Sequence, residues 1–193
     1  MAADDTRDKI LNVANNLFSR FGFHKTSMDE IAKMARKAKG SLYYHFTNKE
    51  KLFTAVVTNE MIILKAKLSI IIDNKDLSAS DKLKQYLVKR MEVLNNAANY
   101  HEILKADFFE HFDFIDELRD ELDTWEKASL KKIFTEGVDK GEFATINDMD
   151  VLLDVFIMVL RGLEIPFYLQ GKYEKYSPYS DGLMSILTKG LST

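Results

Sequence analysis

Six residues between positions 39 and 45 bring hydrogen-bond donors, a glycine and flat rings into one short stretch: Lys39, Gly40, Ser41, Tyr43, Tyr44 and His45. Side chains of these types contact the phosphates and the base edges of double-stranded DNA. In a helix turning about 100° per residue, Ala38, Leu42 and Phe46 would share one apolar face. Gly40 and Tyr44 would then point the opposite way. The stretch therefore predicts a helix that packs on one side and reads DNA with the other.

Helix-start signals on both sides of this stretch define its neighbours. Ser27 and Glu30 have the S-x-x-E spacing of a capping box, so a helix begins at residue 27 or 28. Its apolar residues recur at steps of three and four and predict a packed face. The sequence Thr47-Asn48-Lys49-Glu50 repeats the capping spacing, which limits the intervening helix to about residues 38–46. Two short helices with a tight turn between them predict a helix-turn-helix.

The outward residues of the second helix have alternative explanations. A glycine inside an exposed helix costs about 1 kcal/mol relative to alanine, and close approach of the backbone to DNA offsets that cost. The alternative is that Gly40 only loosens a short helix. For Tyr43 and Tyr44, the alternative is that one ring packs on the neighbouring helix, because both rings cannot face the core.

Positive charge is concentrated where the DNA-reading helix is expected. The net charge is −3, but residues 1–50 hold nine Lys and Arg against six Asp and Glu. The remaining residues hold 18 basic and 24 acidic side chains. Within residues 25–49, basic residues exceed acidic ones by four. An electrostatic DNA footprint requires such an excess, and we expect the acidic remainder to repel DNA.

On these residues the chain resembles the TetR family of bacterial transcriptional regulators. The segments RDKILNVANNLFSRF, GFHKTSMDEIAKMA and KGSLYYHFTNKEKLF are similar to the family's N-terminal three-helix unit, over residues 7 to about 55. The resemblance implies that Lys39, Ser41, Tyr43, Tyr44 and His45 belong to the recognition helix. It also implies that Thr26, Ser27 and Lys49 hold phosphates.

The turn departs from the family pattern. Arg36, Lys37 and Ala38 stand where the family commonly has Gly, Val and Ser, so the turn glycine and the cap of the recognition helix are missing. The departure adds two cations near the phosphates. The candidate DNA-binding residues are Thr26, Ser27, Arg36, Lys37, Lys39, Gly40, Ser41, Tyr43, Tyr44, His45 and Lys49.

The remaining sequence is typical of helices, with no strand and no internal repeat. An apolar stripe from Ile10 to Phe21 predicts the first helix, which Gly22 ends. Further helices are expected at about 49–72, 81–95, 100–114, 115–139, 148–170 and 180–191. The expected fold is all-α with about nine helices. An N-terminal three-helix helix-turn-helix domain (residues 1–48) is joined by a long helix to a C-terminal helical ligand-binding and dimerisation domain (residues 49–193).

Composition excludes several other classes. The 193 residues, 46% of them hydrophobic, suffice for one or two compact units. The absence of cysteine excludes disulfides and thiolate metal sites and is compatible with the cytoplasm. The N-terminus lacks a signal-peptide pattern, and the longest apolar run, Val151 to Leu160, is about half of a bilayer span. We expect a cytoplasmic protein with no membrane partner.

An enzymatic function is not expected. The four histidines are scattered, and HExxH, glycine-rich phosphate loops and nucleophile elbows are absent from the sequence. A metal site formed by Glu110, His111 and Asp113 with His101 is an alternative, but nothing in the sequence fixes its geometry. We expect no catalytic residue, no metal and no cofactor.

Within the helix expected at 148–170, Val151 to Leu160 is apolar almost all round, so one face is expected to meet the domain's own core and another a second copy. Together with the last helix it predicts a four-helix dimer interface, and the family also dimerises through its last two helices. The candidate interface residues are Val155, Val159, Leu183, Met184 and Leu187. The alternative is one large monomeric core. A symmetric dimer predicts a palindromic operator.

A mostly apolar pocket with a few polar anchors is the form expected of a small-molecule site. The candidate ligand-binding residues are Leu64, Leu68, Phe108, Phe112, Trp125, Phe134, Met158, Arg161, Glu164 and Tyr168. For Arg161 and Glu164, an ion pair on the helix surface is the alternative. The sequence thus predicts a sequence-specific DNA-binding repressor that a small-molecule effector releases. The alternative is a DNA-binding or protein-interaction module without an effector.

Overall fold

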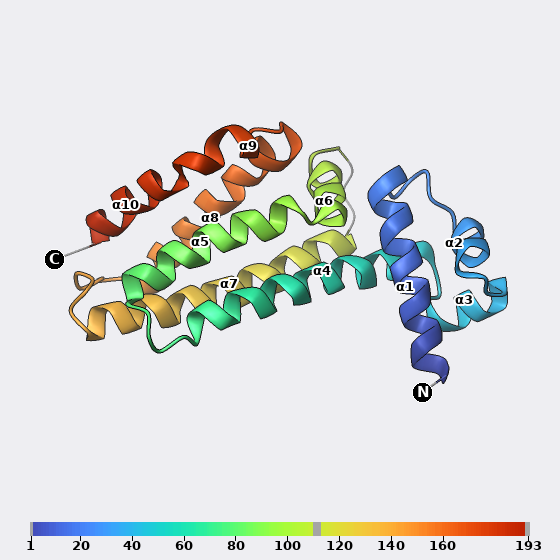
Figure 1. Ribbon diagram of the computed structural model, residues 1–193, viewed down its shortest axis with the longest axis horizontal. Coiled ribbons are helices and arrows are strands. Elements are labelled where there is room, and N and C mark those ends of the chain that lie inside the picture. The colour runs from blue at the N-terminus through green and yellow to red at the C-terminus, as the bar shows by residue number, and fades with distance from the viewer. Residues whose placement is uncertain (1, 110–112, 192–193) are drawn as a thin grey trace. The chain divides into compact units, whose positions relative to one another are not determined.

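The computed structural model describes residues 2–109 and 113–191, and every regular element in these ranges is a helix (Figure 1). The helices are α1 (Ala2–Phe21), α2 (Met28–Ala35), α3 (Lys39–His45), α4 (Lys49–Ile72), α5 (Ala79–Asn95), α6 (Ala98–Phe109), α7 (Asp113–Asp139), α8 (Met149–Glu164), α9 (Tyr173–Tyr176) and α10 (Ser180–Leu191). The predicted all-α class is confirmed. Within the same ranges, no helix combines the length and the apolar content that crossing a membrane requires.

The chain forms two compact units. The first consists of Met1–Ile62 and Ala97–Leu118, and the second of Ile63–Asn96 and Arg119–Thr193. The first unit therefore contains α1, α2, α3 and α6, and both α4 and α7 contribute residues to the two units. The predicted boundary between residues 48 and 49 divides the expected DNA-binding part from the expected effector-binding part. It does not coincide with the division between the compact units, and it stays a prediction.

The core of the first unit forms around one edge of α1. Ile10, Ala14 and Phe18 are fully buried, and the Phe18 ring meets the edge of Phe53 at a centroid distance of 5.1 Å. Gly22 ends the helix with φ +82°, a left-handed conformation that glycine adopts without a Cβ penalty. The periodicity correctly predicted this helix and its end.

The rest of the apolar stripe of α1 does not enter this core. Val13 and Leu17 are half-buried, and Phe21 is 49% exposed. The stripe is therefore wider than the surface that α2 and α4 cover.

The capping box at the start of α2 is confirmed. The Ser27 hydroxyl accepts a hydrogen bond from the Glu30 amide at 3.2 Å, and the Glu30 carboxylate accepts from the Ser27 amide at 2.9 Å. These bonds hold the pKa of Glu30 below its usual range, with the Ser27 backbone as the largest cause. The exact start of the helix-turn-helix is thus fixed by two side chains.

The turn between α2 and α3 is made by a residue other than glycine. Arg36 has φ +54° and ψ +44°, and its amide donates to the Lys33 carbonyl at 3.1 Å. An L-residue pays a steric penalty in this left-handed region. Ala38 then precedes α3 without any side-chain cap. The structure confirms both departures that the sequence indicated: the turn lacks a glycine, and α3 lacks a side-chain cap.

The predicted bounds of α4 are confirmed, but its capping residue differs from the one that the T-x-x-E pattern indicates. Asn48 caps the helix by accepting from the Lys51 amide at 2.8 Å, and α4 begins at Lys49. The T-x-x-E spacing that begins at Thr47 therefore did not identify the capping residue, because an asparagine stood beside it and Asn is the stronger cap.

A half-buried carboxylate of α4 caps the N-terminus of α6. Glu60 accepts from the Asn99 amide at 3.2 Å, from the Asn99 side chain at 2.8 Å and from the Tyr100 amide at 2.9 Å. Burial raises the pKa of Glu60, although the three hydrogen bonds act in the opposite direction. These bonds join α4 to α6 within the first unit.

The core of the second unit is supplied by the apolar faces of its longer helices. Its buried residues include Leu64, Leu68, Leu83, Leu87, Leu94, Leu122, Leu130, Ile133, Phe134, Leu153, Ile157 and Leu160. The regular part of α8 ends at Glu164, earlier than the predicted residue 170. Pro166 lacks an amide hydrogen, so a π-helical turn (Ile165–Leu169) replaces the next α-helical turn. The short α9 was not predicted.

Candidate nucleic-acid interface

The outward face of α3 is exposed as the sequence predicted. Leu42 is fully buried, whereas Tyr44 is 82% exposed. A Cβ built on Gly40 would meet no atom within 4 Å. Since no neighbour within the chain requires a glycine there, the missing side chain leaves the backbone of α3 open to an external ligand.

The other residues of α3 lie at the edges of this face. Tyr43 is 41% exposed, and the ammonium group of Lys39 lies 5.9 Å from its ring centroid. The rings of Tyr44 and His45 meet edge to face at 5.2 Å. Ser41 is half-buried. The alternative in which one tyrosine packs on a neighbouring helix fits Tyr43 better than Tyr44.

Lys39 is paired with a carboxylate of α2. Its Nζ lies 2.7 Å from Asp29 Oδ1, and both side chains are largely exposed. The hydrogen bond to Asp29 is the largest cause that raises the pKa of Lys39. Lys39 therefore remains charged, but its charge is compensated locally until another anion displaces Asp29.

Three candidates for phosphate contact already form hydrogen bonds within the domain. Thr26 is buried, and its hydroxyl donates to the Gly22 carbonyl at 2.9 Å. Ser27 caps α2. Lys49 donates to the Phe23 carbonyl at 3.0 Å and lies 4.3 Å from the Phe23 ring centroid. Their roles toward phosphate stay predictions.

The two cations of the turn have different environments. Arg36 is exposed. Lys37 is half-buried and donates to the Thr6 hydroxyl of α1 at 2.9 Å. Of these two, Arg36 has the side chain that an external phosphate reaches with less rearrangement.

A buried network of charges joins three helices of the second unit. Arg90 of α5 donates to both carboxylate oxygens of Glu126 at 2.7 and 2.9 Å and to Glu164 at 2.8 Å. Arg119 lies 3.3 Å from the other Glu164 oxygen, and Tyr86 donates to Glu126 at 2.9 Å. Two cations and two anions balance, as buried charges require. We call these five residues the buried charge network.

Sequence reasoning selected Glu164 but missed the rest of this network. A signal was available, because Arg90 continues the buried stripe of Leu83, Leu87 and Leu94 at helical spacing, and Glu126 continues that of Leu122. A charged residue at a position where the period requires an apolar one indicates a buried ionic partner.

The structure buries only part of the predicted ligand-binding set. Leu64, Leu68, Phe134 and Glu164 are buried, and Trp125 and Tyr168 are half-buried. Tyr168 donates to the Met91 carbonyl at 3.4 Å. The side chain of Phe108, and Glu110, His111 and Phe112 as a whole, lie outside the described residues.

Arg161 and Met158 lie apart from that buried group. Arg161 forms an ion pair with Asp123 of α7, so Arg161 and Glu164 take different partners. Met158 is 68% exposed. The ligand-binding role of all ten candidates stays a prediction.

One face of α8 is apolar and exposed within the single chain. Val151, Val155, Met158 and Val159 are between 51% and 68% exposed. Val155 follows Val151 by four positions, and Met158 and Val159 follow Val155 by three and four, which places these residues on one side of the helix. The side chains of Leu183, Met184 and Leu187 in α10 lie outside the described part of the structure.

Residues 10–56 match the sequence profile of the bacterial regulatory proteins of the tetR family. Among curated relatives, the HTH-type transcriptional regulator QacR of Staphylococcus aureus is 46% identical over 54 residues. That alignment covers 28% of this chain and 29% of QacR. The chain is thus aligned to under a third of this relative's length.

Two solved structures are similar over nearly the whole chain. A transcriptional regulator from Cytophaga hutchinsonii has a TM-score of 0.77 at 24% identity, covering 95% of this chain and 97% of its own. FadR from Bacillus subtilis, in complex with stearoyl-CoA, has a TM-score of 0.76 at 20% identity, covering 95% and 98%. These likenesses concern the fold.

Proposed function

We propose that this protein is a sequence-specific DNA-binding transcriptional regulator of the TetR family, whose sequence profile residues 10–56 match. The observation that carries the proposal is the outward face of α3. Gly40 leaves the backbone open, and Tyr44 projects into solvent beside it. A helix presented in this way enters the major groove of B-DNA.

The proposed acting form is a homodimer. The exposed apolar face of α8 supports it, because contiguous apolar surface of this kind marks an interaction site. The predicted partner residues in α10 would complete a four-helix interface. Two recognition helices related by a two-fold axis about 34–36 Å apart would read a palindromic operator.

We further propose that a small molecule bound in the second unit releases the operator. FadR from Bacillus subtilis, which has the same fold, was determined with stearoyl-CoA. An effector that binds the DNA-incompetent arrangement more tightly shifts the population away from DNA. The alternative is a DNA-binding or protein-interaction module without an effector.

The first experiment is to recover genomic DNA bound by the purified full-length protein and to sequence it. A palindrome enriched in the recovered fragments supports the proposal, whereas the absence of a shared sequence rejects it. The enriched sequence then serves in gel-shift assays with candidate acyl compounds and other small molecules. Retention of the shift with every compound favours the alternative without an effector.

The assignment of α3 as the reader has its own test. Tyr44→Ala should weaken binding to the enriched operator by about tenfold, as loss of a base contact does, and leave binding to random DNA unchanged. The matched control is Tyr179→Ala, since Tyr179 is 73% exposed in the second unit. Equal effects of the two substitutions would refute the assignment.

A further inference from the structure

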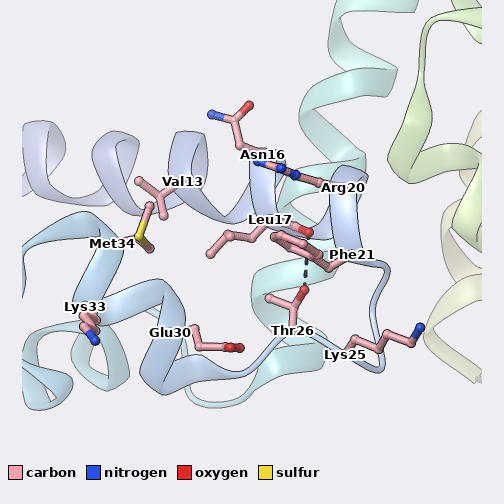
Figure 2. A pocket seen from close by; sticks show the side chains of 10 residues that line it. All are labelled: Val13, Asn16, Leu17, Arg20, Phe21, Lys25, Thr26, Glu30, Lys33 and Met34. Carbon is pink, nitrogen blue, oxygen red and sulfur yellow. Dashed lines mark hydrogen bonds between the residues drawn. The ribbon is translucent and has the colours of Figure 1, made fainter.

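An open cleft lies between α1 and α2 within the first unit (Figure 2). Its volume is about 550 Å³, which falls within the range of sites for small molecules. The lining residues are Val13, Asn16, Leu17, Arg20, Phe21, Lys25, Thr26, Glu30, Lys33 and Met34. None of these is on the outward face of α3, and of the candidate DNA-binding residues only Thr26 lines the cleft.

The floor of the cleft is apolar. Val13, Leu17 and Phe21 are the part of the α1 stripe that does not reach the core, and Met34 of α2 faces them across the cleft (Figure 2). Phe21 is 49% exposed and Met34 62% exposed. Apolar side chains gathered around a concave surface are the usual means of holding the body of a ligand.

The rim of the cleft carries an excess of positive charge. The lining includes three cations, Arg20, Lys25 and Lys33, and a single carboxylate, Glu30, whose Oε2 already accepts from the amide and the hydroxyl of Ser27. Among the described residues, the structure records no ion pair for the three cations. Lys25 and Lys33 lie toward opposite ends of the cleft in Figure 2. A ligand with one negative charge would find a cation at either end.

We propose that this cleft binds a small organic anion, an aromatic or medium-chain alkyl carboxylate. The hydrocarbon body lies on Phe21, Leu17 and Met34, and the carboxylate meets the cations of the rim. Charge complementarity selects an anion over a neutral or cationic compound, and the cleft volume selects a small molecule over a folded partner. The site is independent of the proposed effector site in the second unit.

The test uses the full-length protein with ¹³C-labelled methionine methyl groups and 1-naphthylacetate as the probe. Met34 reports from the cleft, and a Met34→Leu variant identifies its signal. We expect a saturable shift of the Met34 methyl with 1-naphthylacetate. The neutral analogue 2-(1-naphthyl)ethanol should bind about tenfold more weakly, because it lacks the charge that the rim attracts.

Charge reversal separates the cleft from general electrostatics. Lys25→Glu/Lys33→Glu should weaken 1-naphthylacetate at Met34 by at least about tenfold. The control Lys51→Glu/Lys67→Glu makes the same charge change at exposed positions of α4 and should leave the affinity unchanged. Equal losses in both variants, or equal binding of the neutral analogue, would overturn the proposal.

Two further outcomes also reject it. One is that the probe shifts only other methionines, which would place the anion elsewhere in the chain. The other is that a short random-sequence duplex shifts Met34 and 1-naphthylacetate does not. The cleft would then belong to the path of the DNA backbone.

Discussion

At the scale of single residues, the helix-turn-helix carries local costs that its fold does not require. Arg36 occupies the left-handed region in which glycine is favoured, Ala38 leaves α3 uncapped, and Gly40 lies inside a helix with open space around it. Each of these three residues lowers stability relative to a residue better suited to its position: glycine at 36, a capping residue at 38 and alanine at 40. Costs of this kind concentrate at functional surfaces, which supports a role for this turn in contacting DNA.

Replacing Arg36 by glycine should increase stability and weaken the proposed contact with DNA. We expect Arg36→Gly to raise the free energy of unfolding by about 1 kcal/mol in urea titrations, because glycine carries no Cβ penalty at φ +54°. If Arg36 contacts a phosphate, the same variant should lower the slope of log affinity against log salt by about one on random DNA.

The control for this prediction is Arg36→Ala, which removes the charge but keeps the Cβ. It should change the salt slope equally without the gain in stability. A gain in stability for Arg36→Ala comparable to that of glycine would show that the backbone conformation is not the cause.

At the scale of elements, α6 is attached to the first unit through carboxylates. Glu60 of α4 caps its N-terminus, and Glu102 of α6 accepts from the Phe23 amide at 3.3 Å. The same Glu102 oxygen lies 2.8 Å from a Cβ built on Gly22, so a larger residue at position 22 would displace it. The attachment of α6 therefore depends on the protonation state of Glu60 and on the absence of a side chain at Gly22.

The raised pKa of Glu60 gives a prediction about pH. The folded protein holds this proton more tightly than the unfolded chain, whose pKa is near the ordinary 4.5. The stabilising contribution is therefore full below pH 4.5 and is lost as the pH rises through the raised folded value. The free energy of unfolding of the wild type minus that of Glu60→Gln should fall as the pH increases from 4 to about 7. If this difference in the free energy of unfolding did not vary with pH, the raised pKa of Glu60 would not be its cause.

At the scale of the whole molecule, two features bear on stability and assembly: the buried charge network and the apolar face of α8. The buried charge network holds α5, α7 and α8 of the second unit together, and the apolar face of α8, the proposed dimer surface, is exposed in the single chain. The first depends on complete pairing of charges. The second depends on burial of side chains that are more than half exposed in the single chain.

Breaking the network on one side should be costly. Glu126→Ala leaves Arg90 without its bidentate partner, and we expect the free energy of unfolding to fall by about 3–5 kcal/mol. Arg90→Met/Glu126→Leu removes both charges and should cost less than the single substitution, because no charge is stranded. Chemical denaturation of the full chain measures both. A double variant as unstable as the single one would argue that packing, not charge, is what is lost.

The α8 face predicts an effect on assembly. Val159→Glu should convert the proposed dimer to a monomer in sedimentation experiments and abolish binding to a palindromic operator, because buried carboxylates at an interface are costly. Thr135→Glu is the control, since Thr135 is exposed on α7 outside that face. A monomeric wild type at micromolar concentration would remove the proposal of a dimer.

Much of the fold follows from local rules. The stripe and glycine of α1, the capping box of α2 and the uninterrupted α4 appear where the spacing predicted them, because each depends on neighbours within one or two turns. The π-helical turn after Glu164 is likewise local, since Pro166 marks it in the sequence, but the apolar pattern alone concealed it.

The candidate sites were less predictable because they depend on partners that are distant in the chain. Nothing near Lys37 in the sequence indicates that it donates to Thr6, 31 positions away, and nothing near Arg90 indicates Glu164, 74 positions away. Exposure of Tyr44 was predictable, because it follows from the helical phase of Leu42. Which half of the α1 stripe is covered was not, because that depends on how α2 crosses it.

The pair between Lys39 and Asp29 has a consequence for how quickly the protein leaves the wrong DNA. When a phosphate approaches Lys39, it must displace a carboxylate that stays nearby and repels it. On random DNA the proposed recognition helix would gain little to offset this exchange, so the bound protein would dissociate or slide quickly. At an operator, the proposed base contacts of Tyr43 and Tyr44 would offset it. The pair would thereby shorten the search for a target at the expense of general affinity for nucleic acid.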